Sequence, residues 1–210
     1  MDTIYKSDTK RVFLTFDDGP SPVTSKILDI LKQENVKATF FILGSNVDSR
    51  KDVVKRMYEE GHYLANHGYS HTYSKIYSSP QSVLDEYNEC NDKVKSAIEV
   101  PDYNSHLFRF PGGLAGGKYA EIKKEAKELL LQNNIVNVDW NALTGDAETN
   151  NLSVEFEMTR LTETMESKNS LVILMHDAAA KSVTADALPQ IIAKLKEEGY
   201  EFKNFYDIIK

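Results

Sequence analysis

The 210-residue chain is 41% hydrophobic and 27% charged, which is ordinary for a globular domain with a sizeable core. Its length suits one domain, and no linker or low-complexity segment divides it, so residues 1–210 are expected to form a single domain. The net charge of −7 argues against a nucleic-acid groove and against a polybasic contact with anionic lipid, because both need clustered Lys and Arg.

The cysteine count and the N-terminus bear on where the protein acts. Cys90 is the only cysteine, so an intrachain disulfide and a paired-cysteine metal site are excluded, and a buried filler role is favoured. No apolar run approaches the length of a membrane span, and the polar N-terminus lacks a signal-peptide core. The sequence is therefore either intracellular or a mature domain whose export segment was removed, and no membrane contact by this domain is expected.

The first half of the chain alternates short apolar runs with one-sided helical patterns. Strands are predicted at 12–16, 38–44 and 62–68. Helices are predicted at 22–35 and 50–60. An irregular loop rich in Tyr and Ser then leads to Pro80.

The second half repeats this alternation. Strands are predicted at 107–111, 135–141 and 170–176, and a last short strand and turn in the tail at 201–209. Helices are predicted at 81–98, 120–132, 154–165 and 185–198. Near-continuous apolar strands between helices are typical of a parallel sheet covered by helices, so the predicted fold class is α/β. An incomplete (β/α) barrel of about seven parallel strands with outer helices fits better than an open sheet, because no Gly-rich phosphate turn follows the first strand.

Reactive side chains gather at the ends of the predicted strands. Five segments supply them: Asp17 and Asp18, His67 and His71, Arg109, Asp146, and His176. In a parallel barrel these positions share the rim on which active sites are built. Each residue alone has an ordinary structural explanation, so it is their shared position that favours a functional site.

Two histidines and a carboxylate predict a metal site. His67 and His71 have the i, i+4 spacing that brings two imidazoles to one side of a helical turn. Asp18 can complete the ligand set and leave coordination positions open, while its neighbour Asp17 faces elsewhere and can accept a proton. A divalent ion at such a site lowers the pKa of water and polarises a carbonyl. The alternatives are turn chemistry for the paired aspartates and two surface histidines.

The other histidines and the arginine have competing interpretations. His62 lies at the start of its strand, away from the rim, and His106 precedes a strand, so structural roles are expected for both. His176 ends a buried strand and can either protonate a leaving group or serve as a capped structural residue. Arg109 is either a structural core arginine or the partner of Asp17, and the pairing is favoured because an unpaired buried charge is costly.

Five motifs follow one another along the chain: TFDDGP (15–20), HGYSH (67–71), RFPGG (109–113), WNALTGD (140–146) and LMH (174–176). Together they resemble the NodB-homology polysaccharide deacetylases of carbohydrate esterase family 4, over about residues 11–205. The resemblance implies a distorted (β/α) barrel that removes N-acetyl or O-acetyl groups from peptidoglycan, chitin, chitooligosaccharides or xylan. It also implies one divalent metal ion, with Zn²⁺ expected and Co²⁺ or Ni²⁺ as alternatives.

The resemblance further implies roles for the residues at the rim. Asp17 matches the general base, and the metal triad matches Asp18, His67 and His71. Arg109 matches the arginine that orients the base. His176 matches the general acid, and Asp146 matches the carboxylate that keeps it protonated, with Asp139 as a second candidate.

Three further residues are implied in substrate binding. Pro111 belongs to the arginine motif, the backbone N–H of Gly112 is expected to hold the oxyanion, and Leu174 is expected to line the acetyl-methyl pocket. Three positions depart from the usual pattern of relatives: Gly68, Gly112 and Ala147. A hydrogen bond that braces the histidine loop is expected to be missing at Gly68, and the groove wall is expected to be open at Gly112.

The expected substrate is the acetylated glycan of peptidoglycan. Chitooligosaccharide and O-acetyl xylan are the alternatives. A non-haem iron oxygenase also uses two histidines and one carboxylate, but the order Asp–His–His and the second aspartate speak against it. A second alternative is an inactive glycan-binding domain. The presence of Asp17 and His176 speaks against it, because binding alone needs neither a base nor an acid. We expect a monomer that acts outside the cell or at its surface, with a cytoplasmic location as the alternative.

Overall fold

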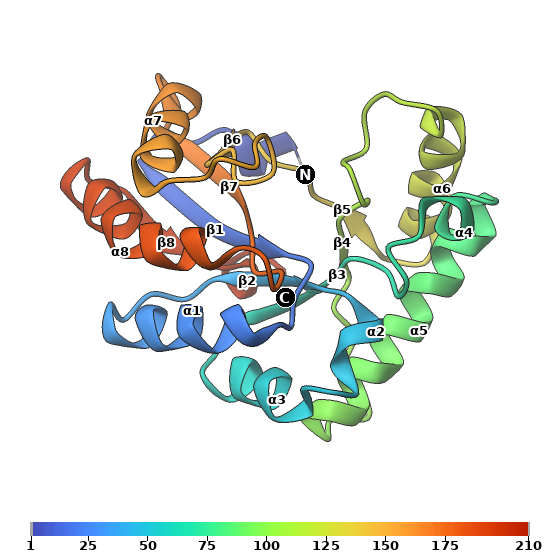
Figure 1. The fold of residues 1–210 in the computed structure, drawn as a ribbon. Coiled ribbons are helices and arrows are strands. Elements are labelled where there is room, and N and C mark those ends of the chain that lie inside the picture. The colour runs from blue at the N-terminus through green and yellow to red at the C-terminus, as the bar shows by residue number, and fades with distance from the viewer. Residues whose placement is uncertain (1, 210) are drawn as a thin grey trace.

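The computed structural model describes residues 2–209, which form a curled parallel sheet with helices on its outside (Figure 1). The strands lie in the order β5-β4-β3-β2-β1-β7-β6, and β8 pairs with β1 beside this path. Every strand pairing is parallel. The expected α/β fold is therefore confirmed: seven parallel strands make a half-barrel that is surrounded by helices.

The bounds of the elements follow the chain order. The strands are β1 (Arg11–Asp17), β2 (Thr39–Ile42), β3 (Tyr63–Asn66), β4 (Leu107–Phe108), β5 (Val136–Asn137), β6 (Ala142–Leu143), β7 (Ser170–His176) and β8 (Glu201–Lys203). The α-helices are α1 (Pro22–Gln33), α2 (Gly44–Val47), α3 (Lys51–Glu59), α4 (Tyr73–Ile76), α5 (Pro80–Ile98), α6 (Ala120–Gln132), α7 (Val154–Met165) and α8 (Ser182–Glu197). Two 3-10 helices are η1 (Asp2–Tyr5) and η2 (Phe205–Asp207).

Strand β1 forms the centre of the sheet. It pairs with β7 over its whole length, with β2 at its carboxyl half and with β8 at its amino half. Alternate side chains of a strand point to opposite faces. Val12, Leu14 and Phe16 thus pack in the cluster that the outer helices cover, whereas Phe13 packs in a separate cluster inside the curl. Thr15 shares the inner face with Phe13.

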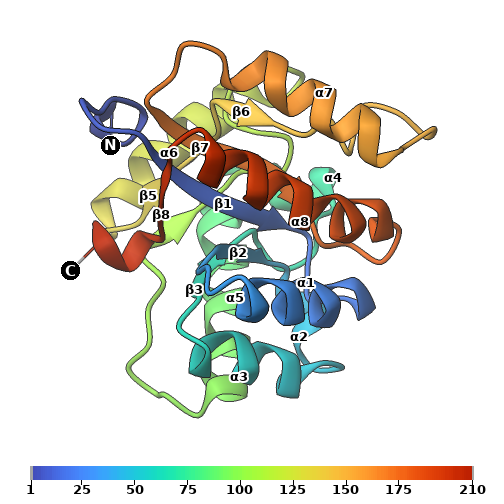
Figure 2. The ribbon, with the colours of Figure 1, turned by 90° about the vertical axis from the view of Figure 1, so that its left-hand side faces the viewer.

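Helices α1 and α8 lie next to each other over β1 (Figure 2). Helix α1 begins directly after the turn that follows β1, because Ser21 caps it and Pro22 occupies its first position. The Ser21 hydroxyl also donates to the carbonyl of Asp177, and the Asp177 N–H donates to the carbonyl of Asp17. The loops after β1 and β7 are therefore bonded together at one rim.

The single strand predicted at 135–141 is wrong. The segment contains β5 at one edge of the sheet and leads into β6 at the other edge, and these two strands do not pair with each other. Side chains hold the segment that joins them: Asn141 bonds to the backbone of Ser170 and Val172 in β7, and Arg109 donates to the carbonyls of residues 138 and 139. The barrel is therefore incomplete where the chain crosses from one edge to the other.

The remaining differences from the sequence prediction are small. The strand predicted at 107–111 ends at Phe108, and the loops after β2 and β3 contain the short helices α2 and α4, which were not predicted. The strand and turn expected in the tail are confirmed as β8 and η2. Within residues 2–209, no helix is both long and apolar enough to cross a membrane.

Candidate metal and catalytic site

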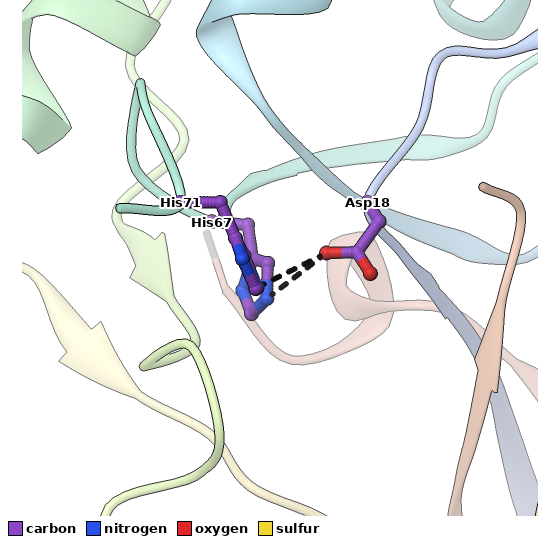
Figure 3. A group of neighbouring side chains, drawn as sticks. All are labelled: Asp18, His67 and His71. Atoms are coloured by element: carbon purple, nitrogen blue, oxygen red, sulfur yellow. Dashed lines mark ion pairs between the residues drawn. The ribbon is translucent and has the colours of Figure 1, made fainter. Parts of the chain in front are cut away.

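Asp18, His67 and His71 meet at the carboxyl ends of β1 and β3 (Figure 3). Oδ1 of Asp18 lies 3.4 Å from Nε2 of His71 and 3.6 Å from Nε2 of His67. One potential ligand atom from each residue lies within 4.8 Å of the others. The three predicted metal ligands are thus brought together around one point.

The chemistry of these three side chains suits a divalent cation. Oδ1 of Asp18 is buried and has no hydrogen-bond partner among the described residues, which is unusual for a carboxylate unless a cation faces it. Nδ1 of His67 donates to the Arg109 carbonyl at 2.8 Å, which leaves the Nε2 lone pair directed at the site. Burial lowers the pKa of His67 to about 3, so the ring is neutral, as a ligand must be.

The two histidines do not lie on a helical turn, and that expectation is wrong. Residues 67–71 form a loop after β3 in which Gly68 has φ +85° and His71 has φ +52°. These left-handed backbone angles curl the loop so that both imidazoles face Asp18, which itself has φ +76°. A Cβ atom at Gly68 would also lie 2.9 Å from Cδ1 of Ile76, so the backbone angle favours glycine there and any larger side chain would require Ile76 to shift.

A carboxylate from α5 braces this loop. Oε2 of Glu86 accepts hydrogen bonds from the N–H groups of Tyr69 at 2.7 Å and Ser70 at 2.6 Å, and Oε1 accepts from the Ser70 hydroxyl at 2.6 Å. Gly68 N–H donates to the side chain of Asn66 at 2.8 Å. The brace that the sequence suggested was missing is therefore supplied from a distant helix.

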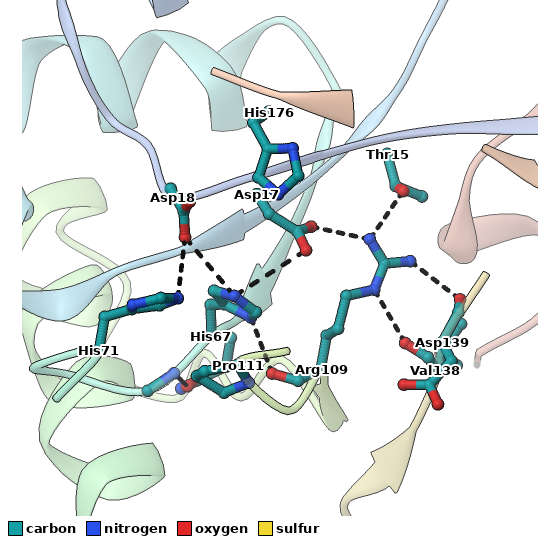
Figure 4. A network of polar contacts seen from close by, with 12 residues as sticks. Thr15, Asp17, Asp18, His67, His71, Arg109, Pro111, Val138, Asp139 and His176 are labelled. Atoms are coloured by element: carbon teal, nitrogen blue, oxygen red, sulfur yellow. Dashed lines mark hydrogen bonds and ion pairs between the residues drawn. The ribbon is translucent and has the colours of Figure 1, made fainter. Parts of the chain in front are cut away.

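Asp17 and Arg109 form a buried ion pair next to the three candidate metal ligands (Figure 4). Nη1 of Arg109 lies 2.7 Å from Oδ1 of Asp17 and 2.8 Å from the hydroxyl of Thr15. The guanidinium also donates to the Val138 and Asp139 carbonyls, each at 3.0 Å, and it stacks on Phe41 with 3.9 Å between the guanidinium carbon and the ring centroid. Arg109 is thus both a structural arginine of the core and the partner of Asp17.

The electrostatics of Asp17 reflect two opposing effects. Burial raises the pKa of this carboxyl above its usual range, and the charge of Arg109 opposes that rise. Oδ2 of Asp17 lies 3.9 Å from Nε2 of His67, so the free oxygen of the pair faces the triad.

His176 ends β7 beside Asp17, which is its register partner on β1. Its Nδ1 lies 2.8 Å from Oδ1 of Asp146, and its backbone N–H donates to Oδ2 at 2.7 Å. Burial alone would lower the pKa of His176, but the hydrogen bond and charge of Asp146, together with the charges of Asp17 and Asp18, raise it to about 9. The other candidate, Asp139, instead accepts from the N–H of Leu114 at 3.1 Å.

The predicted substrate-binding residues flank this centre. Pro111 follows Arg109, and its carbonyl accepts from the Tyr77 hydroxyl at 2.7 Å. Gly112 has φ +74°, and its N–H has no acceptor within residues 2–209. Leu174 lies two residues before His176 on β7, so both side chains point to the same face.

The two histidines predicted to be structural directly precede β3 and β4, at the ends opposite the rim. Nδ1 of His62 accepts from the N–H of Ala38, and Nδ1 of His106 bonds to the carbonyl of Asn134. The Cys90 thiol is buried, and burial raises its pKa, so the thiol stays protonated.

Three residues around the site were missed from the sequence. Thr15 precedes Asp17 by two positions, so strand alternation could have placed it on the same face. Thr184 donates to Oδ2 of Asp146 at 3.0 Å from α8, and Glu86 reaches the histidine loop from α5. No local pattern marks the last two residues, because their contacts depend on helix packing.

Comparison with known proteins identifies the family. Residues 5–132 match the polysaccharide deacetylase family. The chain is 38% identical to YheN of Bacillus subtilis, covering 92% of this chain and 66% of that protein, and 32% identical to a Bacillus cereus peptidoglycan-N-acetylglucosamine deacetylase, covering 95% and 71%. It thus spans just under two thirds of YheN. A solved carbohydrate esterase family 4 structure from Streptococcus mutans superposes with a TM-score of 0.88 at 35% identity, covering 97% of this chain and 90% of that one. The chain belongs to the polysaccharide deacetylase family.

Proposed function

We propose that this chain hydrolyses the N-acetyl group of an amino sugar in peptidoglycan. The observation that carries the proposal is the pairing of Asp17 with His176 across β1 and β7, next to the triad of possible metal ligands. A carboxylate and a raised-pKa histidine on neighbouring strands can act as base and acid on one bound amide.

Asp17 is the proposed general base. Its carboxylate accepts a proton from the water that attacks the acetyl carbon, and Arg109 holds the carboxylate in place and favours its ionised form. The new carbon–oxygen bond turns the carbonyl oxygen into an oxyanion. The free N–H of Gly112 is the proposed donor to that oxygen, and Leu174 is the proposed wall for the methyl group.

His176 is the proposed general acid. Because its Nδ1 is held by Asp146, Nε2 carries the proton that is available to the substrate. When the carbon–nitrogen bond breaks, the sugar nitrogen takes this proton and leaves as an amine, and acetate remains. Asp146 keeps His176 cationic until that step.

Asp18, His67 and His71 are the proposed ligands of one divalent cation. Such an ion lowers the pKa of water and polarises the carbonyl. Two nitrogens and one oxygen suit Zn²⁺, which we propose as the ion, with Co²⁺ or Ni²⁺ as alternatives.

The substrate and location extend the same proposal. A relative that is 32% identical over 95% of this chain bears the name peptidoglycan-N-acetylglucosamine deacetylase, which supports peptidoglycan over chitooligosaccharide or O-acetyl xylan. Peptidoglycan lies outside the cytoplasmic membrane, so the proposed site of action is the cell wall, and the proposed state is a monomer.

The test is acetate release by Zn²⁺-loaded protein from peptidoglycan, chitotetraose and acetylated xylan. We expect release from peptidoglycan with loss of its N-acetyl groups, and an Asp17→Asn variant that keeps the metal but loses turnover. Absence of acetate from all three substrates would refute the hydrolase, and oxygen uptake would favour an iron oxygenase instead. Release from xylan alone would refute the amide substrate.

A further inference from the structure

An exposed tyrosine stands beside the candidate metal site without a role in the chemistry described above. Tyr73 begins α4, two residues after His71, and 40% of its surface is exposed. Its ring lies 5.7 Å from the His71 ring, measured between centroids. Tyrosine presents a flat apolar ring and a polar hydroxyl, so an exposed tyrosine ring next to a site is a candidate ligand contact.

Two other tyrosines hold this ring in position from behind. Tyr77 and Tyr119 make edge contacts with Tyr73 at centroid distances of 5.5 and 6.4 Å. Tyr77 is buried, with only 1% of its surface exposed, and its hydroxyl is bonded to Pro111. Tyr73 is therefore supported on one side while its own surface remains partly open.

The hydroxyl of Tyr73 reaches the loop that carries the proposed oxyanion donor. A Cβ atom at Gly112 would lie only 2.5 Å from this oxygen, so the missing side chain of Gly112 leaves the space that Tyr73 occupies. Throughout residues 2–209, the hydroxyl has no hydrogen-bond partner. The wall that the sequence suggested was open at Gly112 is thus partly filled by Tyr73 from another loop.

We propose that Tyr73 is a binding platform for a pyranose ring of the glycan, at the edge of the metal site. This inference rests on the proposed function for the choice of ligand. The C–H face of a sugar packs on the flat apolar face of an aromatic ring, while the phenol hydroxyl remains available to a sugar hydroxyl. Tyr73 would then select chains in which a second sugar adjoins the acetylated one.

The test measures binding separately from turnover. Tetra-N-acetylchitotetraose is titrated calorimetrically into Zn²⁺-loaded Asp17→Asn protein, with and without Tyr73→Leu or Tyr73→Phe. We expect Tyr73→Leu to raise the dissociation constant about tenfold, and Tyr73→Phe to stay within about threefold, because the ring remains. Tyr206 is a similarly exposed tyrosine on η2, and Tyr206→Leu serves as the matched control without effect.

Two results would overturn the proposal. Equal affinity of Tyr73→Leu and its parent would show that the ring does not contact the glycan. Weaker binding together with a lower zinc content would show that Tyr73 acts by supporting His71 instead. The titration measures binding and needs no acetate release. The effect of Tyr73→Leu on the dissociation constant can therefore be interpreted even if the proposed hydrolysis does not occur.

Discussion

The contact between Asp146 and His176 allows us to predict how the activity depends on pH. Replacing Asp146 with Asn keeps the size of the side chain but removes the charge that faces Nδ1 of His176 at 2.8 Å. His176 must be protonated to act as an acid, so activity falls as the pH rises through its pKa. Loss of the Asp146 charge should therefore move the alkaline limb of the pH profile downward.

The size of this shift follows from the environment of His176. Burial lowers its pKa, and Asp146 provides the largest opposing effect, with smaller ones from Asp17 and Asp18, so the wild-type pKa of about 9 should fall toward the ordinary histidine value of about 6.5 in the variant. At pH 8, His176 is then protonated in about nine in ten molecules of the wild type, and in about one in thirty molecules of Asp146→Asn. We expect a loss of about thirtyfold in kcat/KM at pH 8, and a much smaller loss at pH 6.

The assay is acetate release by zinc-loaded protein between pH 5 and 10, with kcat/KM fitted to two ionisations. Asp139→Asn is the matched control, because Asp139 bonds to the N–H of Leu114 and should leave the alkaline limb unchanged. An alkaline limb that stays in place in Asp146→Asn, or that moves in Asp139→Asn, would refute the assignment of the partner.

Three other substitutions test the frame around the site. Arg109→Met leaves Asp17 buried without its partner. We expect it to lower the free energy of unfolding, measured by chemical denaturation, by about 3 kcal/mol or more. An unchanged midpoint of the denaturation curve would contradict this expectation. Glu86→Ala removes the carboxylate that braces the histidine loop. We expect it to raise the zinc dissociation constant about tenfold in a chelator competition, with Glu86→Gln intermediate. An unchanged zinc affinity would show that the loop keeps its conformation without Glu86. Gly68→Ala forces a side chain into φ +85° against Ile76 and should cost about 1–2 kcal/mol, and a neutral result would contradict the argument from strain.

The rim residues could be predicted because strand ends are visible in the sequence. β1 and β7 are long, apolar and buried, so their last residues could be located to within one position. Parallel strands then bring Asp17 and His176 to the same edge without any knowledge of the helices. The confirmed α/β fold follows from the same alternation of strands and helices.

The local path of the chain at the site could not be predicted in the same way. The spacing of His67 and His71 fits a helical turn, yet the structure has a loop. What selects the loop is the left-handed angle at Gly68 and the carboxylate of Glu86, which arrives from a helix that begins nine residues after His71. Such a contact is set by tertiary packing, and spacing along the chain cannot reveal it.

The broken strand and the buried ion pair of Arg109 with Asp17 belong to one arrangement. Where the chain crosses from β5 to β6, the carbonyls of Val138 and Asp139 have left the ladder and would be costly to bury without donors. Arg109 supplies those donors, and the same guanidinium holds Asp17. A regular strand at this position would pair its own carbonyls and leave the buried arginine with unsatisfied N–H groups. The opening of the barrel therefore gives Arg109 the partners that let it remain charged inside the fold, and through Arg109 it fixes the carboxylate proposed to accept the proton.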